Sequence, residues 1–158
     1  MCIRDRSNPA LVERQVVGVF DKKLLKIFAE GLKNLNLKFA WIVNSEDGLD
    51  EISPYAVTNV TQLKDGQISE IKIDPNALGV NADNFKNLVG DDANFNADKM
   101  IEIFKGGDND FSKAVCLNAA AGLIVGEKFS DFSEAYNHTR EFILSGKTFL
   151  HLEKIQNV

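Results

Sequence analysis

The chain has 158 residues, a formal net charge of −5 and 44% hydrophobic residues, which is typical of one globular domain with a buried core. Its longest apolar runs, such as Phe39–Val43, are too short to cross a bilayer, and lysine and arginine are scattered. We therefore expect neither a membrane nor a nucleic acid as partner, since an anionic surface needs a basic patch. The two cysteines, Cys2 and Cys116, indicate no disulfide framework, and no secretory signal is visible, so we expect a cytoplasmic protein.

The first six residues, Met1–Arg6, show neither periodicity nor a helix cap. They resemble the translated end of a sequencing-library adapter, and we interpret residues 1–6 as adapter-derived rather than as a native polar tail. The domain to be explained is then residues 7–158.

A strand, a helix and a second strand are predicted at the start of that domain. Residues 14–20 form a near-continuous apolar, β-branched run, typical of a strand covered on both faces. Asp21 is a candidate N-cap for a helix of about four turns that ends near Leu35. Residues 38–44 are a second buried strand. Short connections predict a parallel βαβ unit with a right-handed crossover.

A hairpin is predicted next, from strands at residues 57–63 and 67–73. Lys64-Asp65-Gly66 separates them, and Asp-Gly tolerates the positive φ of a tight turn. The irregular spacing of isoleucines in the second strand allows a bulge.

The remaining chain is expected to be helical. Helices are predicted at about 94–105 and 111–125, from about residue 130 to Gly146, and in a final short segment. The second is apolar nearly all round, as expected for a buried helix, and in the third Ala135, Thr139, Phe142 and Ile143 share one face. The fold class is therefore α/β, with a parallel βαβ unit, a β-hairpin and C-terminal helices.

One loop concentrates the candidate chemistry. Glu46, Asp47, Asp50 and Glu51 follow directly on a buried strand, and ligands of open α/β sheets bind at the carboxyl ends of strands. Carboxylates on a flexible loop suit Mg²⁺, which is usually shared with substrate phosphates. The residues alone leave open a solvated acidic surface loop, which is the more frequent outcome, and the spacing matches no complete calcium-binding loop.

Several segments together resemble the anthranilate phosphoribosyltransferases. Asn8-Pro9-Ala10 and the run Arg14–Val19 match the family's order of segments, Asp47-Gly48-Leu49-Asp50-Glu51 matches its acidic signature, and Val115–Ala121 matches a late helix containing Leu-Asn-Ala-Ala. The resemblance covers residues 7–158.

The resemblance implies a fold and an activity. The fold is the large α/β domain of the nucleoside phosphorylase/phosphoribosyltransferase type, of which this chain is the C-terminal part. The family transfers phosphoribosyl from phosphoribosyl pyrophosphate (PRPP) to anthranilate, giving N-(5-phosphoribosyl)anthranilate and pyrophosphate in tryptophan biosynthesis. By the same resemblance Asp50 and Glu51 bind Mg²⁺, while Asp47 helps to shape the loop.

The resemblance also implies what the chain lacks. The family's glycine-rich PRPP loop, its Lys-His-Gly segment and its N-terminal helical domain, through which the parent forms a homodimer, have no match in the sequence. We therefore expect no complete catalytic or substrate-binding set here, and no activity from the chain alone.

The sequence departs from the family pattern at three places. Asn44-Ser45 replaces His-Gly before the acidic loop, Gly90-Asp91-Asp92 replaces Gly-Gly-Asp, and Ser112-Lys113 replaces an Arg-Asp pair. Asn118 belongs to the matched helix motif, and we interpret it as a buried asparagine satisfied by backbone groups rather than as a ligand. His138 and His151 are predicted on helix surfaces.

Two other classes of function are considered. A non-catalytic binding protein of the same fold is disfavoured by the retained acidic signature and by the lack of a basic patch. A nucleoside phosphorylase of the same superfamily is disfavoured because those enzymes lack the Asp-Gly-Leu-Asp-Glu loop.

Overall fold

The computed structural model describes residues 12–157, so the adapter interpretation of residues 1–6 lies outside the described residues. The elements in chain order are β1 (Arg14–Gly18), α1 (Leu24–Asn34), β2 (Phe39–Ser45), β3 (Thr58–Lys64), β4 (Gln67–Ile73), the 3₁₀ turns η2 (Asn76–Leu78) and η3 (Phe85–Leu88), and the helices α2 (Ala93–Phe104), α3 (Asp110–Val125), α4 (Phe132–Leu144) and α5 (Lys147–Gln156). The predicted order of strands and helices is confirmed.

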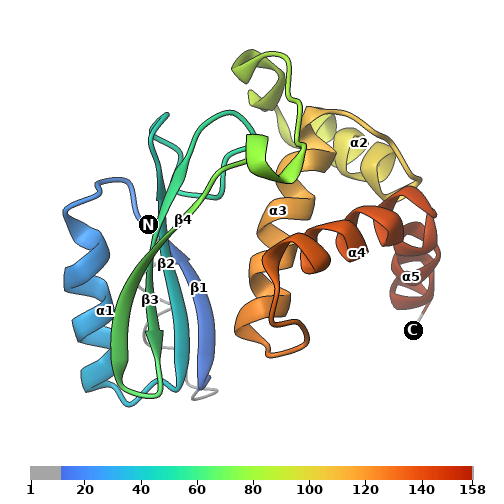
Figure 1. Cartoon of the computed structure of the whole chain (residues 1–158). Coiled ribbons are helices and arrows are strands. Elements are labelled where there is room, and N and C mark those ends of the chain that lie inside the picture. The colour runs from blue at the N-terminus through green and yellow to red at the C-terminus, as the bar shows by residue number, and fades with distance from the viewer. Residues whose placement is uncertain (1–11, 158) are drawn as a thin grey trace.

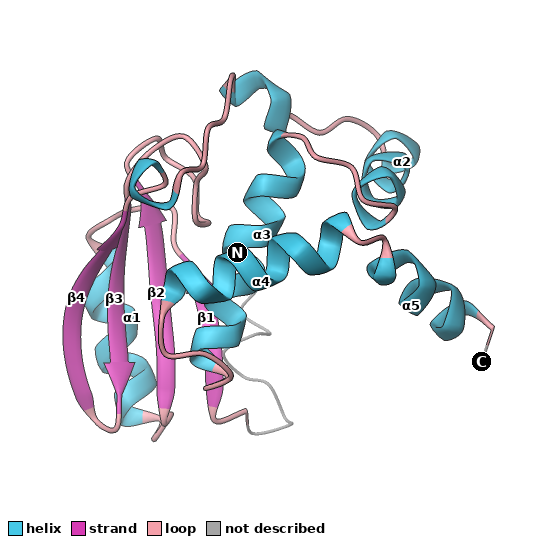
Figure 2. Cartoon of the chain, turned by 45° about the vertical axis from the view of Figure 1, so that its right-hand side comes forward, coloured by secondary structure: helices cyan, strands magenta, loops and turns pink. Residues whose placement is uncertain are grey.

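The four strands form one mixed sheet in the order β1-β2-β3-β4. β1 and β2 are parallel and are joined through α1, as the βαβ prediction requires, whereas β2–β3 and β3–β4 are antiparallel. α1 lies on one side of the sheet and α3 with α4 on the other (Figures 1 and 2).

Helices on both sides explain why β2 is a continuous apolar run. Phe39, Trp41 and Val43 pack with α3 and α4, while Ala40 and Ile42 pack with α1. All seven residues of the strand are buried. The start of α4 closes the α3 side, where the rings of Trp41 and Phe132 lie 5.7 Å apart.

The hairpin turn has the predicted geometry. Asp65 and Gly66 adopt φ values of 48° and 76°, the left-handed conformation of a two-residue turn that matches strand twist. The pairing runs without interruption from Thr58↔Ile73 to Lys64↔Gln67, so the strand contains no bulge.

Three local predictions are wrong. β1 ends at Gly18 and Phe20 is 69% exposed, because the chain leaves the sheet there. Asp21 does not cap α1: its carboxylate accepts from the Lys23 amide in the preceding turn, and the helix has 11 residues, about three turns. Phe142 is exposed, and Tyr136 instead joins the buried face of α4.

The C-terminal helices form a second body of structure beside the sheet. α3 packs between the sheet and α4, while α2 and α5 contact the far part of α4 (Figure 1). Within residues 12–157, no helix combines the length and hydropathy needed to cross a membrane.

Candidate functional site

The acidic loop connects β2 to β3, at the upper end of the sheet in Figure 1. Its first turn is closed by the Gly48 amide donating to the Ser45 carbonyl (3.0 Å), with Gly48 at φ 96°. The Ser45 amide donates to Leu49 O (2.9 Å) and the Glu46 amide to Val57 O (2.9 Å). The backbone of the loop is therefore organised by its own hydrogen bonds.

Asp47 is a structural member of this loop. Its carboxylate accepts from the Leu49 amide (3.2 Å) and from the hydroxyl of Ser53, which is fully buried. The Ser53 amide donates in turn to Thr58 Oγ1 (3.1 Å) at the start of β3. These contacts agree with the expectation that Asp47 shapes the loop.

Asp50 and Glu51 are two adjacent carboxylates of the acidic loop, after the structural Asp47. Both side chains are exposed, and within residues 12–157 neither takes part in an ion pair. Desolvation by surrounding atoms, and then the Asp50 charge, raise the pKa of Glu51. Two neighbouring carboxylates without a cationic partner are a donor set that suits a hard divalent cation.

The described residues offer too few ligands for a complete coordination sphere. Among the described residues no group of three or more histidine, cysteine, aspartate or glutamate side chains could hold a metal ion. Mg²⁺ commonly has one or two protein carboxylates, with waters and substrate phosphates filling the other positions. Asp50 and Glu51 fit that pattern and do not fit an all-protein metal cage.

Two residues distant in sequence hold the backbone of this pair. The Asp50 carbonyl lies against the Cα of Gly18, where an added Cβ would be only 1.7 Å from the carbonyl oxygen. On the other side, Asn118 of α3 binds both backbone groups of Ile52: Oδ1 accepts from its amide and Nδ2 donates to its carbonyl, each at 3.0 Å. Asn118 Nδ2 also donates to Ala114 O (3.0 Å).

The interpretation of Asn118 as satisfied by backbone groups is thus confirmed, although its side chain is half-buried rather than buried. The main partner of Asn118 is Ile52, the residue that follows Glu51, and this pairing was not predicted from the sequence. His138 and His151 are exposed on α4 and α5, as predicted.

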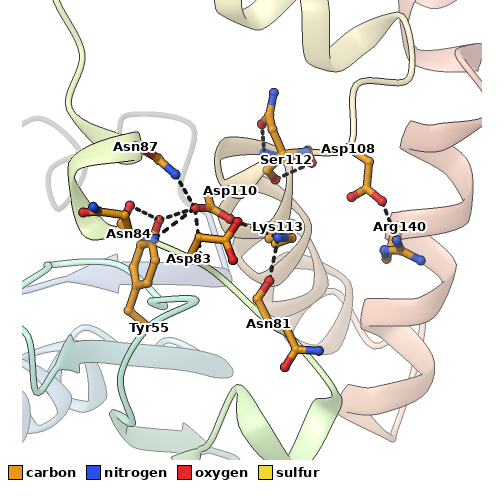
Figure 3. Close-up of polar contacts among 11 residues, drawn as sticks. Tyr55, Asn81, Asp83, Asn84, Asn87, Asp108, Asp110, Ser112, Lys113 and Arg140 are labelled. Atoms are coloured by element: carbon orange, nitrogen blue, oxygen red, sulfur yellow. Dashed lines mark hydrogen bonds and ion pairs between the residues drawn. The ribbon is translucent and has the colours of Figure 1, made fainter.

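A buried carboxylate at the start of α3, Asp110, was not predicted from the sequence. Asp110 Oδ2 accepts from four donors, and Oδ1 pairs with Lys113 (Figure 3). The distances are 2.9 Å to Tyr55 Oη, 3.2 Å to the Asp83 amide, 3.4 Å to the Asn84 amide, 2.8 Å to Asn87 Nδ2 and 3.0 Å to Lys113 Nζ. The network joins the segment after the acidic loop, the η3 turn and the first turn of α3.

The donors around Asp110 decide its charge state. Burial would raise its pKa, but the hydrogen bonds from Asn87, Lys113 and Tyr55 outweigh burial and hold the pKa well below the ordinary range. Burial and the same carboxylate raise the pKa of Tyr55. Asp110 is therefore an ion that structures this region.

The divergent positions have structural roles. Asn44 Nδ2 donates to Val19 O (2.8 Å), which ties the end of β2 to the β1–α1 connection, while Ser45 is buried beside it. Lys113, besides pairing with Asp110, donates to Asn81 O (2.6 Å). The Asp91 backbone exchanges two hydrogen bonds with the side chain of Asn96.

One open groove of the described structure lies away from the acidic loop. A groove of about 770 Å³ between the hairpin and the start of α4 is lined by residues such as Phe39, Gln62 and Ser133, and by none from the acidic loop. Asp50 and Glu51 therefore lie on an exposed edge of the described surface, away from this groove.

Fold and site together define an α/β domain that presents two adjacent carboxylates at the carboxyl end of a buried strand. The chain belongs to the glycosyl transferase family, whose a/b-domain model matches residues 7–149. The predicted α/β fold class is confirmed, and the family match agrees with the resemblance found in the sequence.

Curated relatives agree with this assignment. The chain is 72% identical over 152 residues to the anthranilate phosphoribosyltransferase of Pelagibacter ubique, covering 96% of this chain and 46% of that protein. It is 39% identical over 151 residues to the enzyme of the same name from Clostridium kluyveri, covering 96% and 45%. The chain thus spans about half the length of the relatives that it matches.

Solved structures share the fold. The crystal structure of anthranilate phosphoribosyltransferase from Thermus thermophilus superposes with a TM-score of 0.82 at 27% identity, covering 94% of this chain and 44% of that one. The Saccharomyces cerevisiae enzyme in complex with PRPP and Mg gives a TM-score of 0.77 at 22% identity, covering 89% and 41%.

Proposed function

We propose that this chain is part of an anthranilate phosphoribosyltransferase, which transfers phosphoribosyl from PRPP to anthranilate and releases pyrophosphate. The observation that carries the proposal is the 72% identity to the Pelagibacter ubique enzyme across 96% of this chain, which includes the acidic loop. Residues 7–158 are the C-terminal part of the α/β catalytic domain. The PRPP loop, the helical domain and the homodimer belong to the full-length cytoplasmic parent, whose product enters tryptophan biosynthesis.

Asp50 and Glu51 hold Mg²⁺ in this proposal. Support comes from their exposure, their lack of a cationic partner among the described residues, and the raised pKa of Glu51 beside Asp50. When bound, the metal stabilises the negative charge that develops on the departing pyrophosphate. The chain's own part is to hold two carboxylates at the edge where a substrate phosphate completes the coordination.

The proposal is tested in a chimaera, in which residues 7–158 replace the corresponding segment of the Pelagibacter ubique enzyme. We expect formation of phosphoribosylanthranilate, and we expect Glu51→Gln to reduce kcat/KM roughly 100-fold or more through loss of electrostatic stabilisation. Glu46→Gln is the matched control, because Glu46 belongs to the same loop but faces Lys72, 3.7 Å away. It should retain activity within about 3-fold, as expected for an exposed pair.

Two results would contradict the proposal. A chimaera that folds and binds PRPP without turnover would favour a non-catalytic binding protein, and equal losses from Glu46→Gln and Glu51→Gln would remove the special role of Glu51. The isolated chain is expected to form no product, and activity above that of its own Glu51→Gln variant would disprove this expectation.

A further inference from the structure

We propose that Asn118, acting with Gly18, is a positioning residue for the metal-binding carboxylates. The inference rests on the proposed function, because it concerns the same Asp50–Glu51 pair. It assigns a role to an asparagine and a glycine that would touch neither metal nor substrate.

The argument begins with the backbone around the pair. Asp50 and Glu51 lie on a loop, and their side chains are exposed. Exposed side chains populate many rotamers, and the main chain of a loop is mobile unless other contacts hold it in place. Two carboxylates bind one cation well only if their main chain is held in the right geometry before the cation arrives. The loop's own hydrogen bonds close its first turn at Ser45–Leu49, which lies before the pair.

Asn118 provides the restraint after the pair. Its side-chain amide pairs with Ile52 through one accepted and one donated hydrogen bond, both 3.0 Å, which is the pattern of a strand partner. The third bond, to Ala114 O one helical turn earlier, fixes the orientation of the amide on α3. Ile52 itself is fully buried, so the following residue is anchored by both packing and hydrogen bonding.

Gly18 provides the restraint on the opposite side. The Asp50 carbonyl occupies the place where any other residue would carry its Cβ, which would lie 1.7 Å from the carbonyl oxygen. Gly18 is the last residue of β1, and β1 is held in the sheet by its parallel pairing with β2. The main chain from Asp50 to Ile52 is therefore clamped between the end of β1 and one face of α3.

The inference is tested on the 158-residue chain with Mn²⁺ as the probe. Paramagnetic broadening of backbone amide signals in a ¹H–¹⁵N spectrum reports Mn²⁺ affinity and its location together. We expect selective broadening around Asp50 and Glu51, and roughly ten-fold weaker affinity in Asn118→Ala, as for other groups that orient metal ligands. Amide exchange at Ile52 should accelerate in the same variant.

Asn118→Gln and Gly18→Ala are the companion variants. Glutamine keeps the amide and a good helix propensity but moves it by one methylene, so that it cannot pair with both groups of Ile52. Gly18→Ala displaces Asp50 without touching Asn118. Both are expected to weaken Mn²⁺ binding, and either one keeps the test valid if Asn118→Ala does not fold.

Two controls separate positioning from general stability. Gly122→Ala adds a methyl group to the same helix in open space, and Ile143→Ala removes buried volume from α4. Both variants should leave the Mn²⁺ affinity unchanged. Ile143→Ala should do so even though it lowers the melting temperature of the chain.

The outcomes are distinct. Selective weakening in the Asn118 and Gly18 variants supports the inference. Unchanged affinity in those variants, or an equal loss in Ile143→Ala, overturns the inference and leaves the metal role of Asp50 and Glu51 intact. No broadening in the unsubstituted chain overturns the metal role itself and the inference with it.

Discussion

Replacing Asp110 with asparagine should destabilise this chain far more than its modest change in size suggests. Asp110 Oδ2 accepts from four donors and Oδ1 from Lys113, and the side chain is only 3% exposed. The new amide group must point its NH₂ either toward Lys113 or toward the four donors. In both orientations a donor faces a donor, and the buried negative charge is lost.

The expected loss in the free energy of unfolding is about 3 kcal/mol. Hydrogen bonds to a charged group contribute about 1.5–3 kcal/mol each without adding fully, and breaking a buried pair costs about 3–5 kcal/mol. The side chain of Lys113 is 20% exposed, so the expected loss in the free energy of unfolding lies at the lower end of the range for a buried pair. For a domain of this size the melting temperature should fall by about 6–12 °C.

Urea unfolding followed by the fluorescence of Trp41, the single tryptophan and 3% exposed, measures the loss. Asp108→Asn is the matched control, because its 2.7 Å ion pair with Arg140 is exposed and should be worth less than about 1 kcal/mol. Adding Lys113→Met to Asp110→Asn should recover part of the loss. A loss below about 1 kcal/mol, or one equal to that of the control, would refute the reasoning.

The same network predicts a pH dependence. The pKa of Asp110 lies below its ordinary value because its hydrogen-bond donors outweigh the effect of burial. A lowered folded-state pKa means that stability is contributed above the ordinary value of about 3.9 and is lost as pH falls through the folded pKa. The stability difference between the unsubstituted chain and Asp110→Asn should be full near pH 7 and shrink below about pH 4. A difference that widens on acidification would contradict this assignment.

Two further predictions concern α3. Cys116 is 2% exposed, and burial raises its pKa to about 11. In a Cys2→Ser background, the Cys116 thiol should therefore react with Ellman's reagent at about pH 8 only after the chain unfolds. Rapid reaction of the folded chain would show that α3 is not packed as described. Leu117 is fully buried. Leu117→Ala should lower the free energy of unfolding, measured by urea titration, by about 2–5 kcal/mol. A loss under about 1 kcal/mol would place Leu117 outside the core.

The elements that could be predicted are those with a strong local signal. The unbroken apolar run of β2, the Asp-Gly turn and the helical periodicity of α3 each depend on neighbouring residues, and the structure places all three within a residue or two of the prediction. The errors lie where a local signal competes with packing. Phe20 extends an apolar run, yet β1 ends at Gly18, where the Asp50 carbonyl lies against the glycine and leaves no room for a Cβ.

Part of the candidate site could likewise be predicted from the sequence, and part could not. The acidic signature was visible because its carboxylates are adjacent in sequence, and its position followed from the strand before it. The Asp110 network was invisible, because an aspartate at a helix start is an ordinary N-terminal residue in sequence and the four donors to its Oδ2 lie 23 to 55 positions away.

The sequence by itself therefore determined the α/β class, the order of the elements, the family resemblance and the acidic pair, because periodicity, turn chemistry and short motifs are local properties of the chain. The tertiary structure alone decided what holds that pair in place. Asn118 meets Ile52 across 66 positions, and Gly18 meets Asp50 through a close approach of two backbones. Such contacts depend on how α3 and β1 pack around the loop, and packing is a property of the whole fold that no single segment encodes.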